Sequence, residues 1–93
     1  MKVEQEDNGV KGTFYVEVDG KRGALMTYTW AGTDKIIIDH TEVGDSLRGQ
    51  GVGYVLVKSA VDFLRGQKIK VIPLCPFSKS VFDKKPEYKD VLV

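Results

Sequence analysis

Alternating apolar and polar residues in the first half of the chain predict a series of β-strands. Over residues 12–18, apolar side chains recur at every second position, which is the pattern of a half-buried strand. The dipeptide Asp19-Gly20 follows. Because Asp-Gly between two alternating segments favours a type I′ turn, it predicts a hairpin whose second strand runs from Lys21 to Ala31. After a short turn, Lys35 to Val43 predicts a further strand.

This later strand contains three consecutive isoleucines, which predict a central position with both faces of the strand buried. Strand periodicity divides its residues into two faces, one with Ile36, Ile38, His40 and Glu42 and the other with Ile37, Asp39, Thr41 and Val43. His40 and Glu42 are therefore expected to be neighbours on one face. The polar residues 1–9 predict either a frayed terminus or a short strand at Met1–Glu4.

The second half of the chain changes to helical periodicity. Residues 51–65 predict an amphipathic helix with one apolar face, formed by Val52, Leu56, Ala60, Phe63 and Leu64. Gly66-Gln67 ends this helix, and Lys68 to Leu74 predicts a strand that lies parallel to the strand before the helix through a right-handed crossover. A short helix from Cys75-Pro76 to Asp83 and an apolar tail at 91–93 complete an α+β fold with a mixed, mostly antiparallel sheet.

A glycine-rich segment joins the predicted strand ending at Val43 to the long helix. Closely spaced glycines allow a tight turn, and the first N–H groups of a helix have no internal partner, so this segment suits a phosphate group. It is not a P-loop, because Tyr54 follows the last glycine where Lys and Ser or Thr are required. Its glycine spacing also departs by one residue from the dinucleotide fingerprint. The pattern that fits is Arg48-x-x-Gly51-x-Gly53.

In this pattern the chain resembles the GNAT acetyltransferase superfamily, and further motifs resemble its short, stand-alone branch. These motifs are His40-Thr41-Glu42-Val43, Leu47 to Gly53, Pro73-x-Cys75-Pro76-Phe77 and Pro86-Glu87-Tyr88. The resemblance covers nearly the whole chain and implies one GNAT-like N-acetyltransferase domain over residues 1–93, whose two parallel strands splay apart to admit acetyl-CoA. It also implies a binding loop for the CoA diphosphate formed by Val43, Arg48, Gly49, Gln50, Gly51, Val52 and Gly53.

The resemblance further implies roles for residues near the expected acetyl group. Glu42 stands where many GNAT enzymes have a general base, and His40 can serve the same purpose near neutral pH. Cys75 is expected at a helix N-cap, where the helix dipole lowers a thiol pKa, and it either accepts the acetyl group or lines the pocket. No tyrosine stands where larger relatives place a general acid. The adenosine phosphates are expected near lysines in the last part of the chain, at Lys79, Lys84 and Lys85.

Composition narrows the function classes. A net charge of +1 gives no strong attraction to nucleic acid or membranes, and one cysteine with one histidine forms no metal-ligand spacing. With no apolar segment long enough to span a bilayer, we expect a cytoplasmic protein, monomeric or weakly dimeric. The leading prediction is an N-acetyltransferase that acts on a protein lysine, a polyamine or a small amine. A non-catalytic acyl-CoA-binding module and an interaction domain are the alternatives.

Overall fold

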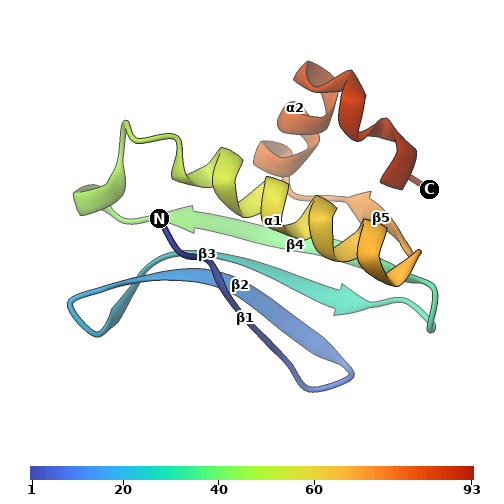
Figure 1. Ribbon diagram of the computed structural model, residues 1–93, viewed down its shortest axis with the longest axis horizontal. Coiled ribbons are helices and arrows are strands. Elements are labelled where there is room, and N and C mark those ends of the chain that lie inside the picture. Colours follow the sequence, from blue (N-terminus) through green and yellow to red (C-terminus); the bar gives the residue numbers. More distant parts are fainter.

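The computed structural model describes all 93 residues and has the predicted α+β architecture. Its elements are β1 (Glu4–Asp7), β2 (Lys11–Val18), β3 (Lys21–Trp30), β4 (Lys35–Val43), the 3-10 turn η1 (Asp45–Leu47), α1 (Val52–Gln67), β5 (Lys70–Pro73), α2 (Pro76–Lys84) and the 3-10 segment η2 (Pro86–Val91). The strands form one sheet in the order β1-β2-β3-β4-β5, antiparallel except for the parallel pair β4 and β5 (Figure 1).

The first hairpins follow the turn chemistry of the sequence. Asp19 and Gly20 both have positive φ angles, 52° and 78°, as the predicted type I′ turn requires. The first strand is Glu4–Asp7, so the boundary predicted at Met1–Glu4 was too early. Its residues are polar because β1 is an edge strand with both faces largely exposed, which leaves no apolar pattern to find.

Hydrogen bonds to the Asp7 side chain connect this edge strand to residues of β3. This carboxylate accepts hydrogen bonds from the Tyr28 hydroxyl at 2.6 Å and from the Trp30 indole N–H at 2.9 Å. The backbone N–H of Gly9 donates to the same carboxylate at 2.7 Å. Partial burial is the largest single influence and raises the pKa of Asp7, but the three hydrogen bonds together lower it below its usual value.

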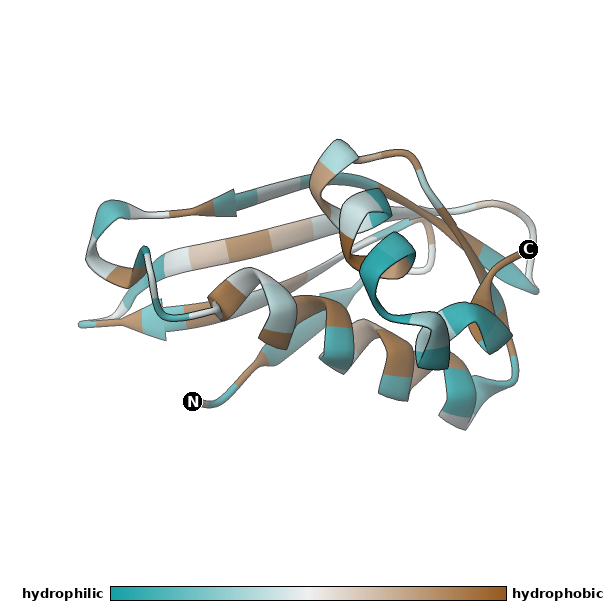
Figure 2. Ribbon diagram, turned by 90° about the horizontal axis from the view of Figure 1, so that it is seen from above, coloured by the Kyte–Doolittle hydropathy of each residue, from teal (hydrophilic) through white to brown (hydrophobic).

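The core lies between one face of the sheet and the two helices. α1 crosses this face, and α2 packs beside α1 and against β4 and β5 (Figures 1 and 2). Hydrophobic and hydrophilic bands alternate along α1 in Figure 2, as its predicted amphipathic pattern requires. The largest fully buried side chains come from both layers: Tyr28, Met26, Ile36 and Ile38 from strands, and Leu56, Leu64 and Phe82 from helices.

The opposite face of the sheet has no helix over it. Ile36 and Ile38 are fully buried, but Ile37 on the uncovered face is only half-buried. The expectation that β4 is buried on both faces was therefore wrong for this residue. Both helices lie on the same side, and a largely antiparallel sheet can leave its other side in water.

A β-bulge in β4 changes which residues face the core. Thr27 of β3 pairs with His40, but the next residue, Tyr28, pairs with Ile38, so Asp39 is the extra residue of the bulge. Beyond it, the buried Met26 pairs with Thr41, and paired residues of neighbouring strands share a face. His40 and Glu42 therefore lie on the uncovered face, and the prediction that they share the face of Ile36 and Ile38 was wrong.

The parallel strands β4 and β5 separate after four residue pairs. Pairing runs from Lys35 with Lys70 to Ile38 with Pro73, and β4 continues to Val43 without a partner on that side. The N–H groups of Leu74 and Cys75 both donate to the Ile38 carbonyl at 3.1 Å, which marks the point of separation. The predicted splayed pair is present. Because β5 is the last strand of the sheet, the pair lies at one side of the sheet rather than at its centre.

Candidate functional site

A run of free backbone N–H groups leads into α1. None of the N–H groups of residues 49–54 donates to a backbone carbonyl, and the first helical bond at this end is from the Val55 N–H to the Gly51 carbonyl, at 3.2 Å. Gly49 and Gly51 have positive φ angles of 80° and 71°, and a Cβ atom at either position would meet nothing within 4 Å. Consecutive free donors at a helix N-terminus beside open space have the arrangement that suits an anion.

Gly53 has a different reason to be glycine. It is buried, and a Cβ atom there would collide with the ring of Phe77 from α2. The same ring contacts Tyr54 edge-on, with centroids 5.9 Å apart. Gly53 therefore allows α2 to pack on the first turn of α1, in addition to contributing an N–H group.

The other residues of the predicted loop are near this run but contribute differently. Val52 is buried in the core, so only its backbone faces the loop. Val43 is half-buried at the end of β4. The side chain of Gln50 donates to the Ser46 carbonyl at 3.2 Å. Arg48 is exposed and its Nε lies 3.2 Å from Asp45 Oδ1, so its charge is at the loop but shared with a carboxylate.

Cys75 lies where β4 and β5 separate. As predicted, it is the N-cap of α2, with Pro76 at the first helical position. It is buried, and its Sγ lies 3.3 Å from the Thr41 Oγ1. Burial is the largest single influence and raises the pKa of the thiol, but hydrogen bonding to Thr41 and to the backbone of Phe77 and Ser78 outweighs it, so the pKa is lowered.

His40 and Glu42 are neighbours, as predicted, but they are not on the side of Cys75. His40 Nε2 lies 3.5 Å from Glu42 Oε1, and both side chains are more than half exposed on the uncovered face. The bulge at Asp39 brings Thr41 to the side of Cys75 instead. Sequence reasoning missed Thr41 because strict two-residue alternation carries no sign of a bulge.

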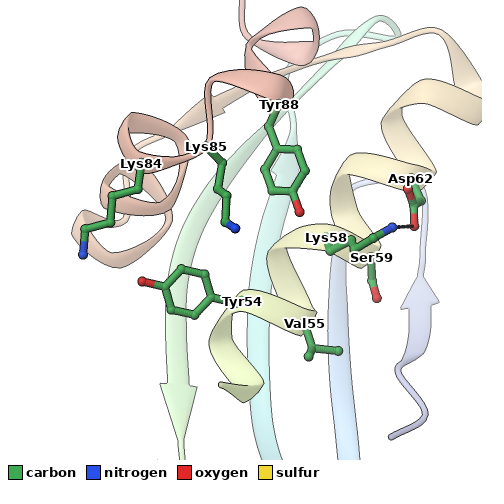
Figure 3. Close-up of a pocket in the computed structure, with 8 residues that line it drawn as sticks. All are labelled: Tyr54, Val55, Lys58, Ser59, Asp62, Lys84, Lys85 and Tyr88. Atoms are coloured by element: carbon green, nitrogen blue, oxygen red, sulfur yellow. Dashed lines mark hydrogen bonds and ion pairs between the residues drawn. The ribbon is translucent and has the colours of Figure 1, made fainter. Parts of the chain in front are cut away.

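The structure also contains a groove between α1 and the α2–η2 segment, with a volume of about 680 Å³. Figure 3 shows the residues that line it: Tyr54, Val55, Lys58, Ser59, Asp62, Lys84, Lys85 and Tyr88. It contains the predicted Lys84 and Lys85 but not Lys79. Its α1 side was not predicted, although Tyr54, Lys58 and Asp62 recur at helical spacing on the exposed side of that helix.

No group of three or more His, Cys, Asp and Glu side chains is arranged to hold a metal ion. None of the helices combines the length and apolar character needed to cross a membrane.

Comparisons with known proteins identify one family for this chain. The sequence model of GCN5-related N-acetyl-transferases matches residues 13–91. The solution structure of a GCN5-like protein from Staphylococcus aureus is 35% identical, with a TM-score of 0.77, and the match covers 99% of this chain and 87% of that one. The crystal structure of a protein from Clostridium acetobutylicum, solved with acetyl-CoA, is 14% identical, with a TM-score of 0.65. The match covers 81% of this chain and 56% of that one. At this low identity it supports the fold alone.

Among curated proteins, Protein NATD1 of Xenopus tropicalis is 30% identical over 63 residues, which are 68% of this chain. The match spans 58% of the length of that relative.

Proposed function

This chain belongs to the GCN5-related N-acetyltransferase family, and on that premise we propose that it binds acetyl-CoA and transfers the acetyl group to a primary amine. The observation that carries the proposal is the run of free N–H groups at residues 49–54. Backbone donors at a helix N-terminus suit the CoA diphosphate, and Arg48 adds positive charge nearby.

The gap between β4 and β5 suits the thioester arm. From the diphosphate at the start of α1, the pantetheine chain would follow the unpaired edge of β4 beyond Ile38 toward Cys75. Unpaired strand edges offer N–H and C=O groups to the amides of such a chain. The acetyl group would then lie beside the Cys75 thiol and the Thr41 hydroxyl.

In this arrangement the amine approaches from the uncovered face of the sheet. Its nitrogen attacks the thioester carbonyl, Glu42 or His40 takes the proton that the amine loses, and the carbon–sulfur bond breaks to release CoA as the thiolate. The bulge supports this division, since it presents Thr41 to the donor side and His40 and Glu42 to the acceptor side. Side chains that are more than half exposed also suit an accessible amine, such as a lysine side chain or a polyamine.

The donor half of the proposal is tested by calorimetric titration of acetyl-CoA into wild-type protein, Gly51→Asp and Gly51→Asn. Both substitutions place a side chain of the same size in open space, at a positive φ angle that Asp and Asn tolerate. Only Asp adds a negative charge beside the diphosphate. We expect Gly51→Asp to weaken binding at least tenfold more than Gly51→Asn, on the order of 1.4 kcal/mol. Equal binding of acetyl-CoA by the two variants would contradict the proposed diphosphate site at residues 49–54.

The transfer half is tested by following thiol release from acetyl-CoA with a panel of amines. We expect Glu42→Gln to lower kcat by roughly 10²-fold or more without changing acetyl-CoA binding. Glu17→Gln, a matched change on another exposed strand position, should leave kcat unchanged. Wild-type protein that binds acetyl-CoA yet releases no thiol with any amine would instead indicate a non-catalytic acyl-CoA-binding module.

A further inference from the structure

A pocket distinct from the groove lies where the end of β4 pairs with the start of β3. Its volume is about 460 Å³, within the range of about 300 to 1,000 Å³ common for small-molecule sites. The charged residues that line it are Arg22, Glu42 and Arg48. Thr41 also lines it, and the Thr41 Oγ1 lies 3.3 Å from the Cys75 Sγ. The pocket therefore adjoins both the proposed base Glu42 and the proposed position of the acetyl group.

Three paired residues form a row across the uncovered face of the sheet at this pocket. Glu42 of β4 pairs with Leu25 of β3, and Leu25 pairs with Tyr15 of β2. Paired residues share a face, and neighbouring strands lie about 4.8 Å apart, so the row is about 10 Å long. The half-buried, apolar Leu25 thus separates the carboxylate of Glu42 from the ring of Tyr15.

The guanidinium of Arg22 is held at the Tyr15 end of this row. Its Cζ lies 4.0 Å from the centroid of the Tyr15 ring, which is a cation–π contact. Its Nη2 donates to Glu6 Oε1, but a guanidinium has five N–H donors, so donors remain for a second anion. Arg22 lines the pocket, whereas Glu6 and its cross-strand partner Glu17 do not. On the pocket side, Arg22 therefore offers positive charge and hydrogen-bond donors.

The pocket presents a carboxylate, an apolar surface and a guanidinium in this order. Primary amines are protonated near neutral pH, so Glu42 attracts the ammonium form of an acceptor before it takes the proton. A guanidinium binds carboxylates, for which its planar set of donors is suited. We propose that the acceptor is an aliphatic ω-amino acid, whose amine lies at Glu42, whose methylene chain covers Leu25 and whose carboxylate is bound by Arg22.

This inference rests on the proposed acetyl transfer and specifies its acceptor. The amine nitrogen gains the acetyl group and loses one proton, and the carbon–sulfur bond breaks, so the products are the N-acetylated ω-amino acid and CoA. A polyamine would bring its second ammonium group to the Arg22 guanidinium, and this repulsion disfavours it. Arg48 lies at the proposed diphosphate site and shares its charge with Asp45, so the carboxylate is assigned to Arg22.

The test compares acceptors of equal length by thiol release from acetyl-CoA. We expect a kcat/KM for 6-aminohexanoate about tenfold above that for hexylamine, through a lower KM, because the carboxylate adds a charge-assisted hydrogen bond that solvent exposure weakens. The diamine 1,6-diaminohexane and the isomer 2-aminohexanoate, whose amine is next to its carboxylate, should be no better than hexylamine.

Two variants assign the preference to Arg22. Arg22→Gln should lose the preference for 6-aminohexanoate through a higher KM and leave the kinetics with hexylamine unchanged. Damage to the fold would instead impair both acceptors alike. Lys21→Gln removes the same charge from the neighbouring exposed residue, which does not line the pocket, and should keep the preference.

The outcomes separate this inference from the proposed function. If wild-type protein acetylates hexylamine or 1,6-diaminohexane as efficiently as 6-aminohexanoate, the role of the pocket is overturned and acetyl transfer stands. A preference that survives in Arg22→Gln would overturn it as well. Thiol release with none of these amines would overturn both the transfer and this inference.

Discussion

The contact between Gly53 and Phe77 allows a test of why residue 53 is glycine. The test distinguishes packing against Phe77 from ligand binding by the glycine-rich loop. Replacing Gly53 with Ala introduces a Cβ atom that collides with the Phe77 ring, so the ring must move. Overpacking of this kind costs about 1–3 kcal/mol. Ala is also the better helix former, by up to about 1 kcal/mol. We therefore expect Gly53→Ala to lower the free energy of unfolding by up to about 2 kcal/mol.

The sign of the effect should change when the ring is absent. In a Phe77→Ala background the new Cβ atom meets no ring, so only the helix propensity remains and Gly53→Ala should stabilise the protein by up to about 1 kcal/mol. The coupling between the two changes then equals the overpacking term, about 1–3 kcal/mol. Urea denaturation of the four proteins, followed by circular dichroism, measures it.

Additive effects would refute this account. If the coupling is below about 0.5 kcal/mol, the ring does not restrict position 53. Gly53 would then be glycine for the sake of a ligand, as the sequence pattern alone suggests. The same reasoning explains the choice of Gly51 for the binding test, because a substitution at Gly53 would disturb α2 as well as the loop.

Two further predictions concern titrating groups. Folding lowers the pKa of Asp7, so its contribution to stability is complete above the unfolded value of about 3.9 and is lost as the pH falls below it. As the pH falls below about 4, wild-type protein should therefore lose stability more steeply than Asp7→Asn in urea denaturation, and parallel curves would contradict the role of this carboxylate. For Cys75, alkylation by a small reagent should follow a thiol pKa below the ordinary value, and Thr41→Val should move the midpoint to higher pH while keeping the shape of the side chain. An unmoved midpoint would show that Thr41 does not stabilise the thiolate.

The sequence by itself determined most of the elements and the position of the glycine-rich loop between β4 and α1. Strand alternation, the Asp19-Gly20 turn and the apolar face of α1 are local patterns, and the structure has β4 and the turn where those patterns placed them. The N-cap position of Cys75 could also be predicted, because Pro76 restricts where a helix begins. Each of these follows from the backbone preferences of a few neighbouring residues.

Only the tertiary structure decided which residues meet. The bulge at Asp39 depends on pairing with β3 and exchanges the faces of Thr41 and Glu42, so it separates the candidate base from Cys75. The groove depends on the contact between Arg65 of α1 and Asp90 of η2, which holds η2 against α1. These two residues are 25 positions apart in the sequence. The packing role of Gly53 depends on a ring from another helix. Local periodicity carries no information about such contacts, since strand register and helix docking are set by burial over the whole core.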